Sequence, residues 1–252
     1  MLQFDRHAAA YDAIRHRISY PEALYRHLAG LCPGHDGAID LGCGNGVSTA
    51  RLVPYFRSVT GVDHGAQLVD RARRNHPSLA FHCARAEAFD APAQVDLVTC
   101  ATAFYWMDRD AVIARCAGWL RDGGVFCAYR YDFPVVYGPA REVVDEELAL
   151  RWSRWRDPRL TAYDDTRERL VQSGFFPDAD RFVVPNILTL SPQDLALFFL
   201  STSYVTRFVE ESGDASYADT LVARITEAAG GAQVHVNFDI HAFAARRCAR
   251  PA

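Results

Sequence analysis

Short apolar runs alternate with helix-like stretches along the first 130 residues. Runs of this kind predict five strands, at Gly37–Leu41, Ser58–Asp63, Leu79–Cys83, Val95–Cys100 and Gly124–Arg130. Helical spacing of apolar residues predicts helices between them, at Gly46–Phe56, Ala66–Asn75 and Asp110–Leu120. Alternating strands and helices are typical of a parallel sheet that has helices on both faces. The pattern therefore predicts an α/β fold.

The second half of the chain has a different pattern. Its predicted elements are a helical insertion at Pro134–Leu160, helices at Asp164–Ser173, Pro192–Leu200 and Tyr217–Ala229, and strands at Arg181–Leu190 and Gln233–Ala244. Pro185 predicts an edge position or a bulge within the first of these strands. Late strands that run antiparallel to the others are common in mixed sheets. We therefore expect residues 1–252 to form one sheet domain with helical insertions.

Composition narrows the function classes. The 252 residues include 27 basic and 31 acidic side chains, and the net charge of −4 disfavours a nucleic-acid partner. The chain has no lysine, which excludes a Walker-type nucleotide site and a Schiff-base enzyme. Seven cysteines without a C-x-x-C pair, no signal peptide and no apolar run of membrane-spanning length favour a cytoplasmic protein, and the arginine bias favours a GC-rich, bacterial genome.

A glycine-rich turn, Asp40-Leu41-Gly42-Cys43-Gly44-Asn45-Gly46, follows the first strand. Glycines at such a turn allow positive φ angles and a close approach of the backbone to a ligand. The dinucleotide fingerprint needs Gly or Ala at position 47, where this chain has Val47. Asp40 would repel a pyrophosphate and suits a ligand with an ammonium group. The alternative is an ordinary strand-to-helix turn with a buried acid.

Asp63 ends the second strand, in the run Val59-Thr60-Gly61-Val62-Asp63. A carboxylate at this place accepts hydrogen bonds from both ribose hydroxyls of a bound nucleoside. The alternative role is the N-cap of the helix that begins near Ala66. The neighbouring glycine turn favours the ribose role.

These motifs resemble those of the class I S-adenosylmethionine-dependent methyltransferases. The D-L-G-C-G-x-G and V-x-G-V-D runs are similar to the first two family motifs, and Ala84–Phe89, Asp96–Thr102 and Leu120–Gly124 are similar to the next three, with Asp122 where proline is usual. The resemblance covers residues 4–130. It implies a doubly wound, mostly parallel seven-stranded sheet of Rossmann-like type and S-adenosyl-L-methionine as cofactor. The cofactor-binding residues that it implies are Tyr11, Arg17, Asp40, Gly42, Cys43, Gly44, Gly46, Asp63, His64, Ala86, Glu87, Ala101 and Thr102.

The segment before the first strand extends the resemblance. Phe4-Asp5 through Ala9, Tyr11, Arg17 and Tyr20-Pro21 are similar to a lead-in found in small-molecule methyltransferases. The resemblance implies that residues 1–30 cover the cofactor. The alternative is an amphipathic helix on the surface.

The aromatic run Ala103–Asp108 follows the fourth strand and resembles that of the trans-aconitate-type branch, with Tyr105 in place of a histidine. Tyr105 or Trp106 is expected to face the sulfonium and stabilise it by a cation–π contact, and core packing of the aromatic side chains is the alternative. Arg130 is the third candidate catalytic residue, because an arginine would hold a carboxylate acceptor. A hydroxyl acceptor would instead need a base, and His64 or Tyr105 are the candidates.

Two segments, residues 134–160 and 191–213, are expected to form a lid over the acceptor. Trp152, Tyr204 and Arg207 are the candidate substrate-binding residues within them. For the Arg and Trp residues of Arg151–Arg156, a solvated helix face is the alternative.

The sequence thus predicts a methyltransferase for a small-molecule metabolite or natural product, with O-methylation of a carboxylate or hydroxyl. The alternative functions are a cofactor-binding regulatory protein and a non-methylating, cyclase-type relative. His235 and His241 lack other ligands at suitable spacing, so no metal is expected. We expect no membrane partner, and a homodimer is kept open.

Overall fold

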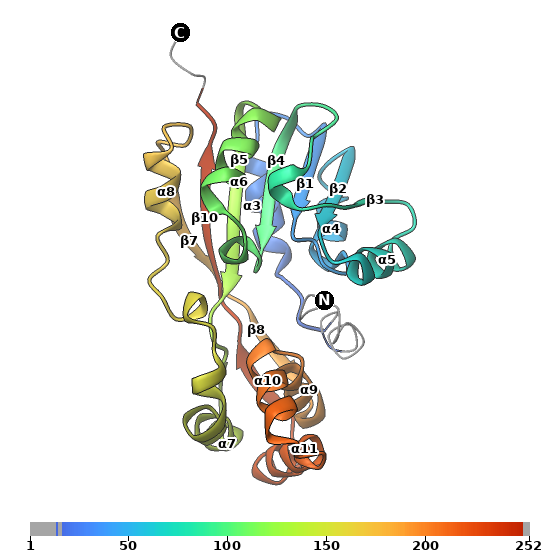
Figure 1. The fold of residues 1–252 in the computed structure, drawn as a ribbon, viewed down its shortest axis with the longest axis vertical. Helices are drawn as coiled ribbons and strands as arrows, with labels where there is room; N and C mark the ends of the chain where they lie inside the picture. Colours follow the sequence, from blue (N-terminus) through green and yellow to red (C-terminus); the bar gives the residue numbers. More distant parts are fainter. Residues whose placement is uncertain (1–13, 15–16, 249–252) are drawn as a thin grey trace. The chain divides into compact units, whose positions relative to one another are not determined.

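The computed structural model describes residue 14 and residues 17–248 (Figure 1). The chain divides into two compact units. Among the described residues, we call 20–131, 163–184 and 240–248 the sheet unit, and 14, 17–19, 132–162 and 185–239 the helical unit. Each unit is built from separate stretches of the chain.

The sheet unit contains a seven-stranded sheet with the order β3-β2-β1-β4-β5-β10-β7. Its strands are β1 (Gly37–Leu41), β2 (Ser58–Asp63), β3 (Ala80–Cys83), β4 (Val95–Ala101), β5 (Leu120–Tyr131), β7 (Asp180–Val184) and β10 (Ile240–Arg246). The first five strands run parallel, and β10 runs antiparallel to both of its neighbours. The predicted seven-stranded, mostly parallel sheet is confirmed.

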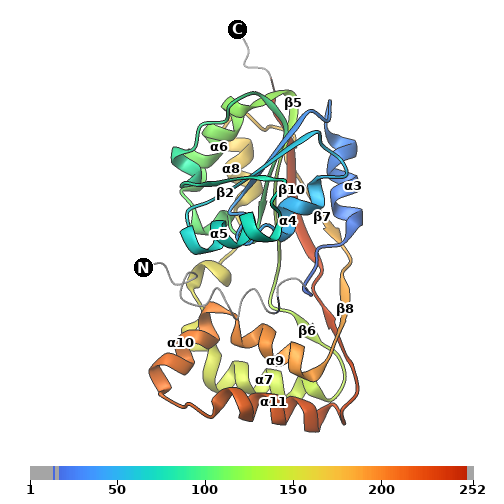
Figure 2. The same ribbon diagram turned by 90° about the vertical axis from the view of Figure 1, so that its right-hand side faces the viewer.

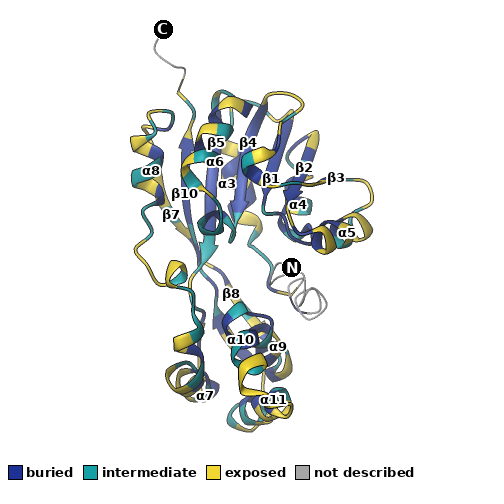
Figure 3. Ribbon diagram, viewed as in Figure 1, coloured by how far each residue is buried: buried dark blue, intermediate teal, exposed yellow. Residues whose placement is uncertain are grey.

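Helices cover both faces of this sheet, as Figure 2 shows. They are α3 (Glu22–Leu31), α4 (Val47–Leu52), α5 (Ala66–Asn75), α6 (Arg109–Trp119) and α8 (Thr166–Gln172), with short 3-10 turns at Ala86–Ala88 and Phe104–Trp106. Alternate residues of β5 face different cores, because successive side chains of a strand point to opposite faces. Phe126 and Ala128 pack with residues of α6 and α8, whereas Val125 and Cys127 pack with residues of α3 and α4. The central strands are accordingly the most buried part of the unit (Figure 3).

The helical unit combines helices with a small antiparallel sheet of order β6-β9-β8. Its elements are β6 (Val135–Val136), α7 (Ala140–Glu147), a π-helical turn (Leu148–Trp152), 3-10 turns at Ser153–Trp155 and Pro158–Leu160, β8 (Ile187–Leu190), α9 (Pro192–Leu200), α10 (Ser203–Ser212), α11 (Tyr217–Ala228) and β9 (Val234–Asn237). The predicted insertions 134–160 and 191–213 both lie in this unit. The prediction that the whole chain forms one domain stays a prediction.

Two predicted strands are wrong in extent, because each is divided between the two sheets. The stretch Arg181–Leu190 breaks at Pro185, and β7 and β8 on its two sides belong to different sheets. The stretch Gln233–Ala244 breaks at residues 238 and 239, between β9 and β10. At the break, the Asp239 carboxylate accepts a hydrogen bond from the Asn186 backbone N–H at 2.8 Å. Side-chain periodicity continues through such a break, so the pattern could not show it.

Candidate functional site

The glycine turn joins β1 to α4 at the carboxyl edge of the sheet. Gly42, Gly44 and Gly46 have φ angles of 67°, 55° and 87°, which favour glycine. Close packing also requires glycine at position 42, since a Cβ atom there would lie 2.3 Å from the Cβ atom of Ala103. The Gly42 backbone N–H donates to the Val62 carbonyl of β2 at 2.7 Å. The turn is therefore fixed between the ends of β2 and β4.

Asp63 links this turn to the end of β2. One carboxylate oxygen accepts from the Gly44 backbone N–H at 2.9 Å, and the other accepts from the Gly65 backbone N–H at 2.7 Å. His64 Nδ1 lies 3.5 Å from Asp63 Oδ1, and its side chain is 45% exposed. A carboxylate offers about four acceptor positions, so two backbone bonds orient the group without exhausting it. Its bond to Gly65, the residue before α5, also fits the capping alternative.

Asp40 lies on β1 and is fully buried. Its two oxygens accept hydrogen bonds from the hydroxyls of Thr49 on α4, at 2.7 Å, and Thr99 on β4, at 2.8 Å. Burial raises the pKa of this carboxyl to about 6, against the lowering effect of the hydrogen bonds from Thr49, Thr99 and Ser48. A buried acid held by hydroxyls gains from a nearby cation.

The Asp40 surroundings continue into a group of buried hydroxyls. Ser48 Oγ lies 2.7 Å from the Tyr129 hydroxyl and accepts a hydrogen bond from the Tyr25 hydroxyl at 3.3 Å. Burial raises the pKa of both tyrosines above the usual range. Tyr25, Ser48 and Tyr129 belong to α3, α4 and β5, so their hydrogen bonds connect these three elements close to Asp40.

The segment after β4 is strained. Among the described residues, Thr102 is the one non-glycine residue with a positive φ angle, 53°. Its backbone N–H donates to the Tyr129 carbonyl at 2.7 Å, and its hydroxyl lies 2.7 Å from the Tyr20 hydroxyl. Strain of this kind is held where the surroundings over-determine it, often at a functional site. Ala101 ends β4 directly before it.

Tyr105 and Trp106 lie in the 3-10 turn after Thr102, with their ring centroids 5.1 Å apart. The Arg130 guanidinium lies 5.6 Å from the Tyr105 ring centroid, and its Nε lies 3.4 Å from Asp164 Oδ2. The structure therefore brings Tyr105 and Arg130 together at the ends of β4 and β5. A cavity of about 20 Å³ lies here and is lined by Thr102, Ala103, Phe104, Tyr105, Ala128, Tyr129, Arg130, Asp164, Thr166, His241 and Phe243.

The remaining predicted cofactor residues of the sheet unit lie near the ends of β1 and β3. Cys43 is buried within the glycine turn, and burial raises the pKa of its thiol well above the usual value, so a reactive thiolate is disfavoured. Ala86 is buried in the 3-10 turn after β3. The Glu87 carboxylate accepts from the Asp108 backbone N–H at 3.0 Å.

The predicted site residues Arg17 and Trp152 lie in the helical unit, where they contact other residues of that unit. Tyr11 lies outside the described residues. Arg17 forms an ion pair with Asp194 of α9 at 2.5 Å. The Trp152 indole is fully buried, stacks on Phe199 with centroids 4.9 Å apart, and donates to the Tyr217 hydroxyl at 2.7 Å.

Tyr204 is also buried, with its ring centroid 6.2 Å from that of Trp152. Arg207 contributes to the lowered pKa of Asp157, about 2, although the hydrogen bond from Arg159 is the largest cause. Trp152 and Tyr204 thus belong to the core of the helical unit, and their substrate-binding role stays a prediction.

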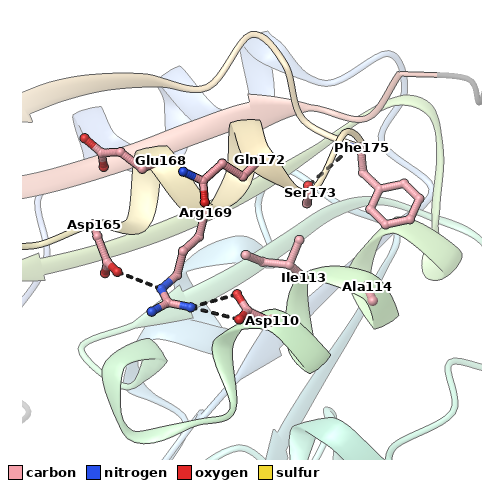
Figure 4. Close-up of a pocket in the computed structure, with 9 residues that line it drawn as sticks. All are labelled: Asp110, Ile113, Ala114, Asp165, Glu168, Arg169, Gln172, Ser173 and Phe175. Carbon is pink, nitrogen blue, oxygen red and sulfur yellow. Dashed lines mark hydrogen bonds and ion pairs between the residues drawn. The ribbon is translucent and has the colours of Figure 1, made fainter.

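A larger groove on the sheet unit lies between α6 and α8 (Figure 4). The Arg169 guanidinium spans it, donating to both oxygens of Asp110 at 2.9 Å and to Asp165 at 2.9 Å. Arg169 offsets only part of the negative charge, because the Asp110, Asp165 and Glu168 carboxylates all line the groove. Within the part of the chain that the structure describes, no three His, Cys, Asp or Glu side chains are grouped to hold a metal ion.

Residues 38–124 match the sequence model of the methyltransferase domain family. A solved protein of Anaeromyxobacter dehalogenans, assigned to type II methyltransferases, is 28% identical with a TM-score of 0.76, over 90% of this chain and 97% of that one. A Saccharomyces cerevisiae protein that is named as an S-adenosylmethionine-dependent methyltransferase is 29% identical over 50% of this chain and 48% of its own length. A trans-aconitate 2-methyltransferase of Rhodopseudomonas palustris (strain BisA53) is 30% identical over 57% of this chain and 55% of its own.

The chain resembles the class I S-adenosylmethionine-dependent methyltransferases, as the family match and these relatives support. It spans about half the length of the curated methyltransferases that it matches. The solved methyltransferase, by contrast, is covered almost completely, so the fold extends through both units of this chain. The family's cofactor is S-adenosylmethionine.

The residues at the carboxyl edge of the sheet fit this methyltransferase cofactor. A nucleoside needs a carboxylate for its ribose hydroxyls, and Asp63 is oriented by two backbone N–H groups beside the glycine turn. An amino acid with a sulfonium carries two positive centres, and Asp40 is a buried acid whose contacts are hydroxyls. The glycine turn itself is packed so closely on Ala103 that no side chain fits at Gly42.

Sequence reasoning missed the partners of these groups. Thr49, Thr99 and Tyr129 surround Asp40 and Ser48, and Asp164 and His241 join Arg130. Thr49 lies just after the glycine turn and could have been found there, whereas the contacts of the other residues depend on strand register and on the return of α8 and β10 to the sheet. Thr102 alone gave a signal, through its place after the fourth strand.

Proposed function

We propose that this chain transfers the methyl group of S-adenosylmethionine to an oxygen atom of a small-molecule acceptor. The observation that supports the proposal is the close packing of Gly42 against Ala103. This contact holds the glycine turn against the Thr102–Ala103 segment, beside Asp40 and Asp63. The turn supplies the cofactor end of the site, and the aromatic residues that follow Thr102 supply the acceptor end. A carboxylate or a hydroxyl is the proposed acceptor group.

The cofactor, when bound, supplies a methyl group on a positively charged sulfur. The residues of this chain have to hold the acceptor oxygen in line and exclude water. Methyl transfer would form the oxygen–carbon bond as the carbon–sulfur bond breaks, with the bonding electron pair left on the sulfur. A carboxylate is ionised at neutral pH and loses its charge in this step, so no proton moves. A hydroxyl acceptor needs a base, for which His64 and Tyr105 are the proposed candidates.

The trans-aconitate 2-methyltransferase among the relatives supports a carboxylate acceptor, because its named substrate is a tricarboxylate. The aromatic segment of this chain has Tyr105 at its centre, and Arg130 lies over that ring. Cytoplasmic location and the absence of a nucleic-acid partner belong to the same proposal. None of the described helices has the length and apolar character to cross a membrane.

The test has two stages. Isothermal titration with S-adenosylmethionine should give micromolar binding, and NADH should not bind. Incubation with a panel of carboxylic acids and alcohols that includes trans-aconitate should then give S-adenosylhomocysteine and a product that is heavier by one CH2 group. Binding without any product across the panel would favour a regulatory protein. A product of unchanged carbon count would favour a cyclase-type reaction.

A further inference from the structure

Four aromatic rings of the helical unit form a cluster that has an arginine beside it. The rings belong to Phe133, Trp152, Phe199 on α9 and Tyr204 on α10. The Phe199 centroid lies 4.9 Å from that of Trp152 and 5.6 Å from that of Phe133. The Arg156 guanidinium lies 5.2 Å from the Phe133 centroid and 6.0 Å from the Tyr204 centroid. Arg156 is thus held against rings from two separate stretches of the chain.

The surroundings of the Arg156 guanidinium are unusual for an arginine of this chain. Its Nε is buried and, among the described residues, has no hydrogen-bond partner. A buried Nε without such a hydrogen bond also occurs in three arginines that do form ion pairs: Arg115 with Asp90, Arg121 with Asp36 and Asp96, and Arg247 with Asp122. Within the same described part of the chain, Arg156 pairs with no carboxylate.

The acid next to Arg156 in the chain is committed elsewhere. Asp157 accepts hydrogen bonds from the Arg159 backbone N–H at 3.0 Å and from the Arg159 guanidinium at 2.9 Å and 2.8 Å. The hydrogen bond from the Arg159 side chain is the largest cause of the lowered pKa of Asp157, about 2. The positive charge of Arg156 therefore lies among aromatic rings and is not offset by this neighbour.

A cation in such surroundings favours an anionic ligand. Aromatic faces attract a guanidinium but leave its in-plane N–H donors without acceptors. Apolar walls also strengthen an ion pair, because they lower the local dielectric constant. The Arg156 side chain is only partly buried although its Nε is buried, so the two Nη groups are the part that a ligand can reach. Two N–H groups in this fork match the two oxygens of a carboxylate.

The aromatic cluster indicates the body of that ligand. Trp152, Phe199 and Tyr204 are buried, whereas Phe133 is partly exposed. A carboxylate on the Nη groups of Arg156 comes beside the Phe133 ring, which packs well against an aromatic or conjugated body. Arg156 also belongs to the predicted lid segment 134–160, which is expected to contact the acceptor. The acceptor is therefore the ligand that we expect at this place.

We propose that Arg156 binds a carboxylate of the acceptor, with Phe133 beside the planar body of that acceptor. The inference rests on the proposed methyl transfer and adds a substrate class to it, the aromatic or conjugated carboxylic acids. The contacts that support it all lie within the helical unit.

The test measures binding by the full chain, saturated with S-adenosylhomocysteine. Isothermal titration compares trans-cinnamate with trans-cinnamyl alcohol, which has a similar planar body without the charge. The unchanged protein should bind the acid at least tenfold more tightly than the alcohol. R156Q should remove this preference, and R156K should keep part of it, because lysine has the charge but not the fork.

R154Q is the matched control. Arg154 is an exposed arginine of the same segment whose guanidinium lies 4.7 Å from the centroid of the Trp155 ring. Its substitution changes the net charge by the same amount as R156Q and should leave the preference for the acid intact. Loss of the preference in R154Q as well would assign it to overall charge and would overturn the role of Arg156.

Equal binding of acid and alcohol by the unchanged protein would also overturn the inference, as would a preference for the acid that persists in R156Q. S-adenosylmethionine titrations on the same proteins separate this failure from that of the proposed function. If the unchanged protein binds S-adenosylmethionine but has no preference for the acid, only the site at Arg156 is refuted. Absence of S-adenosylmethionine binding would refute the proposed function itself. Thermal melting tests whether each variant is folded.

Discussion

Asp40 and Thr99 are direct neighbours on β1 and β4, and the threonine hydroxyl donates to the buried carboxylate at 2.8 Å. Burial raises the pKa of Asp40 to about 6, so the ionised form opposes folding. The pKa of Asp40 in the folded protein lies above its usual value of about 4, and the stability that protonated Asp40 contributes is lost as the pH rises from about 4 to about 6.

The D40N variant tests this relationship. Its free energy of unfolding, relative to the unchanged protein, should rise between pH 4 and pH 6 by ~2–3 kcal/mol and stay constant above pH 7. Urea unfolding of the cofactor-free proteins at several pH values measures the difference. D90N, which removes a carboxylate that is 88% exposed, is the control and should show no such rise. A pH-independent difference for D40N would show that Asp40 does not titrate as described.

Substitution of Gly42 should damage cofactor binding more than it damages the fold. G42A places a Cβ atom 2.3 Å from the Ala103 Cβ atom and a side chain at a φ of 67°, so the turn must move. G174A is the matched control, because its φ is 73° and no atom lies within 4 Å of the added Cβ. Both variants should lose about 1–2 kcal/mol of stability from the positive φ, and G42A should lose more because of the contact with Ala103. Titration with S-adenosylmethionine should show at least tenfold weaker binding for G42A alone.

Asp63 is expected to contribute to cofactor affinity. D63A removes the acceptor of the Gly44 and Gly65 N–H groups together with the proposed ribose contact. Binding of S-adenosylmethionine should weaken by ~1.5–3 kcal/mol, which isothermal titration measures. Circular dichroism and thermal melting identify the part that comes from folding. Unchanged affinity in a folded D63A protein would remove Asp63 from the site.

The pH profile of methyl transfer should distinguish the two acceptor groups. A carboxylate acceptor needs no base. The rate of methyl transfer to such an acceptor should therefore change little between about pH 6 and pH 9. A hydroxyl acceptor should instead give a rate that rises with an apparent pKa near ~7 for a histidine base. H64Q and Y105F are the variants to compare. A steep rise that one of them abolishes would reject the carboxylate acceptor.

The helical unit depends on a buried chain of hydrogen bonds. Trp152 Nε1 donates to the Tyr217 hydroxyl, which donates to Glu147 at 2.6 Å. Y217F leaves the indole N–H and one carboxylate oxygen without this partner and should cost ~1–3 kcal/mol in urea unfolding. The control Y163F removes an exposed tyrosine hydroxyl that also donates to a glutamate, Glu168, and should change stability little. Equal effects of the two substitutions would contradict the role of burial.

The sequence predicted those parts of the fold and site that depend on local pattern. The five parallel strands and the glycine turn follow from residues that are adjacent in the chain, and the structure confirms them. The division of Arg181–Leu190 and Gln233–Ala244 between two sheets depends instead on which strands pair, and apolar alternation is the same on both sides of each break. The positions of Asp40 and Asp63 beside the glycine turn follow from the same local pattern, and their cofactor-binding roles stay predictions. The contacts of Arg130 with His241 and Asp164 could not be predicted, because they depend on the β5–β10 register and on the return of the segment before α8 to the sheet.

The position of β10 in the sheet limits the order in which the protein can fold. This strand, Ile240–Arg246, lies between β5 and β7, although it is the last of the described strands along the chain. During translation, β7 therefore has no place beside the sheet until residue 246 has left the ribosome. The Phe126–Ala128 stretch of β5 also stays unpaired on that side until then. The nascent sheet thus exposes an apolar edge throughout the synthesis of the helical unit, which is the interval when a chaperone would be needed most.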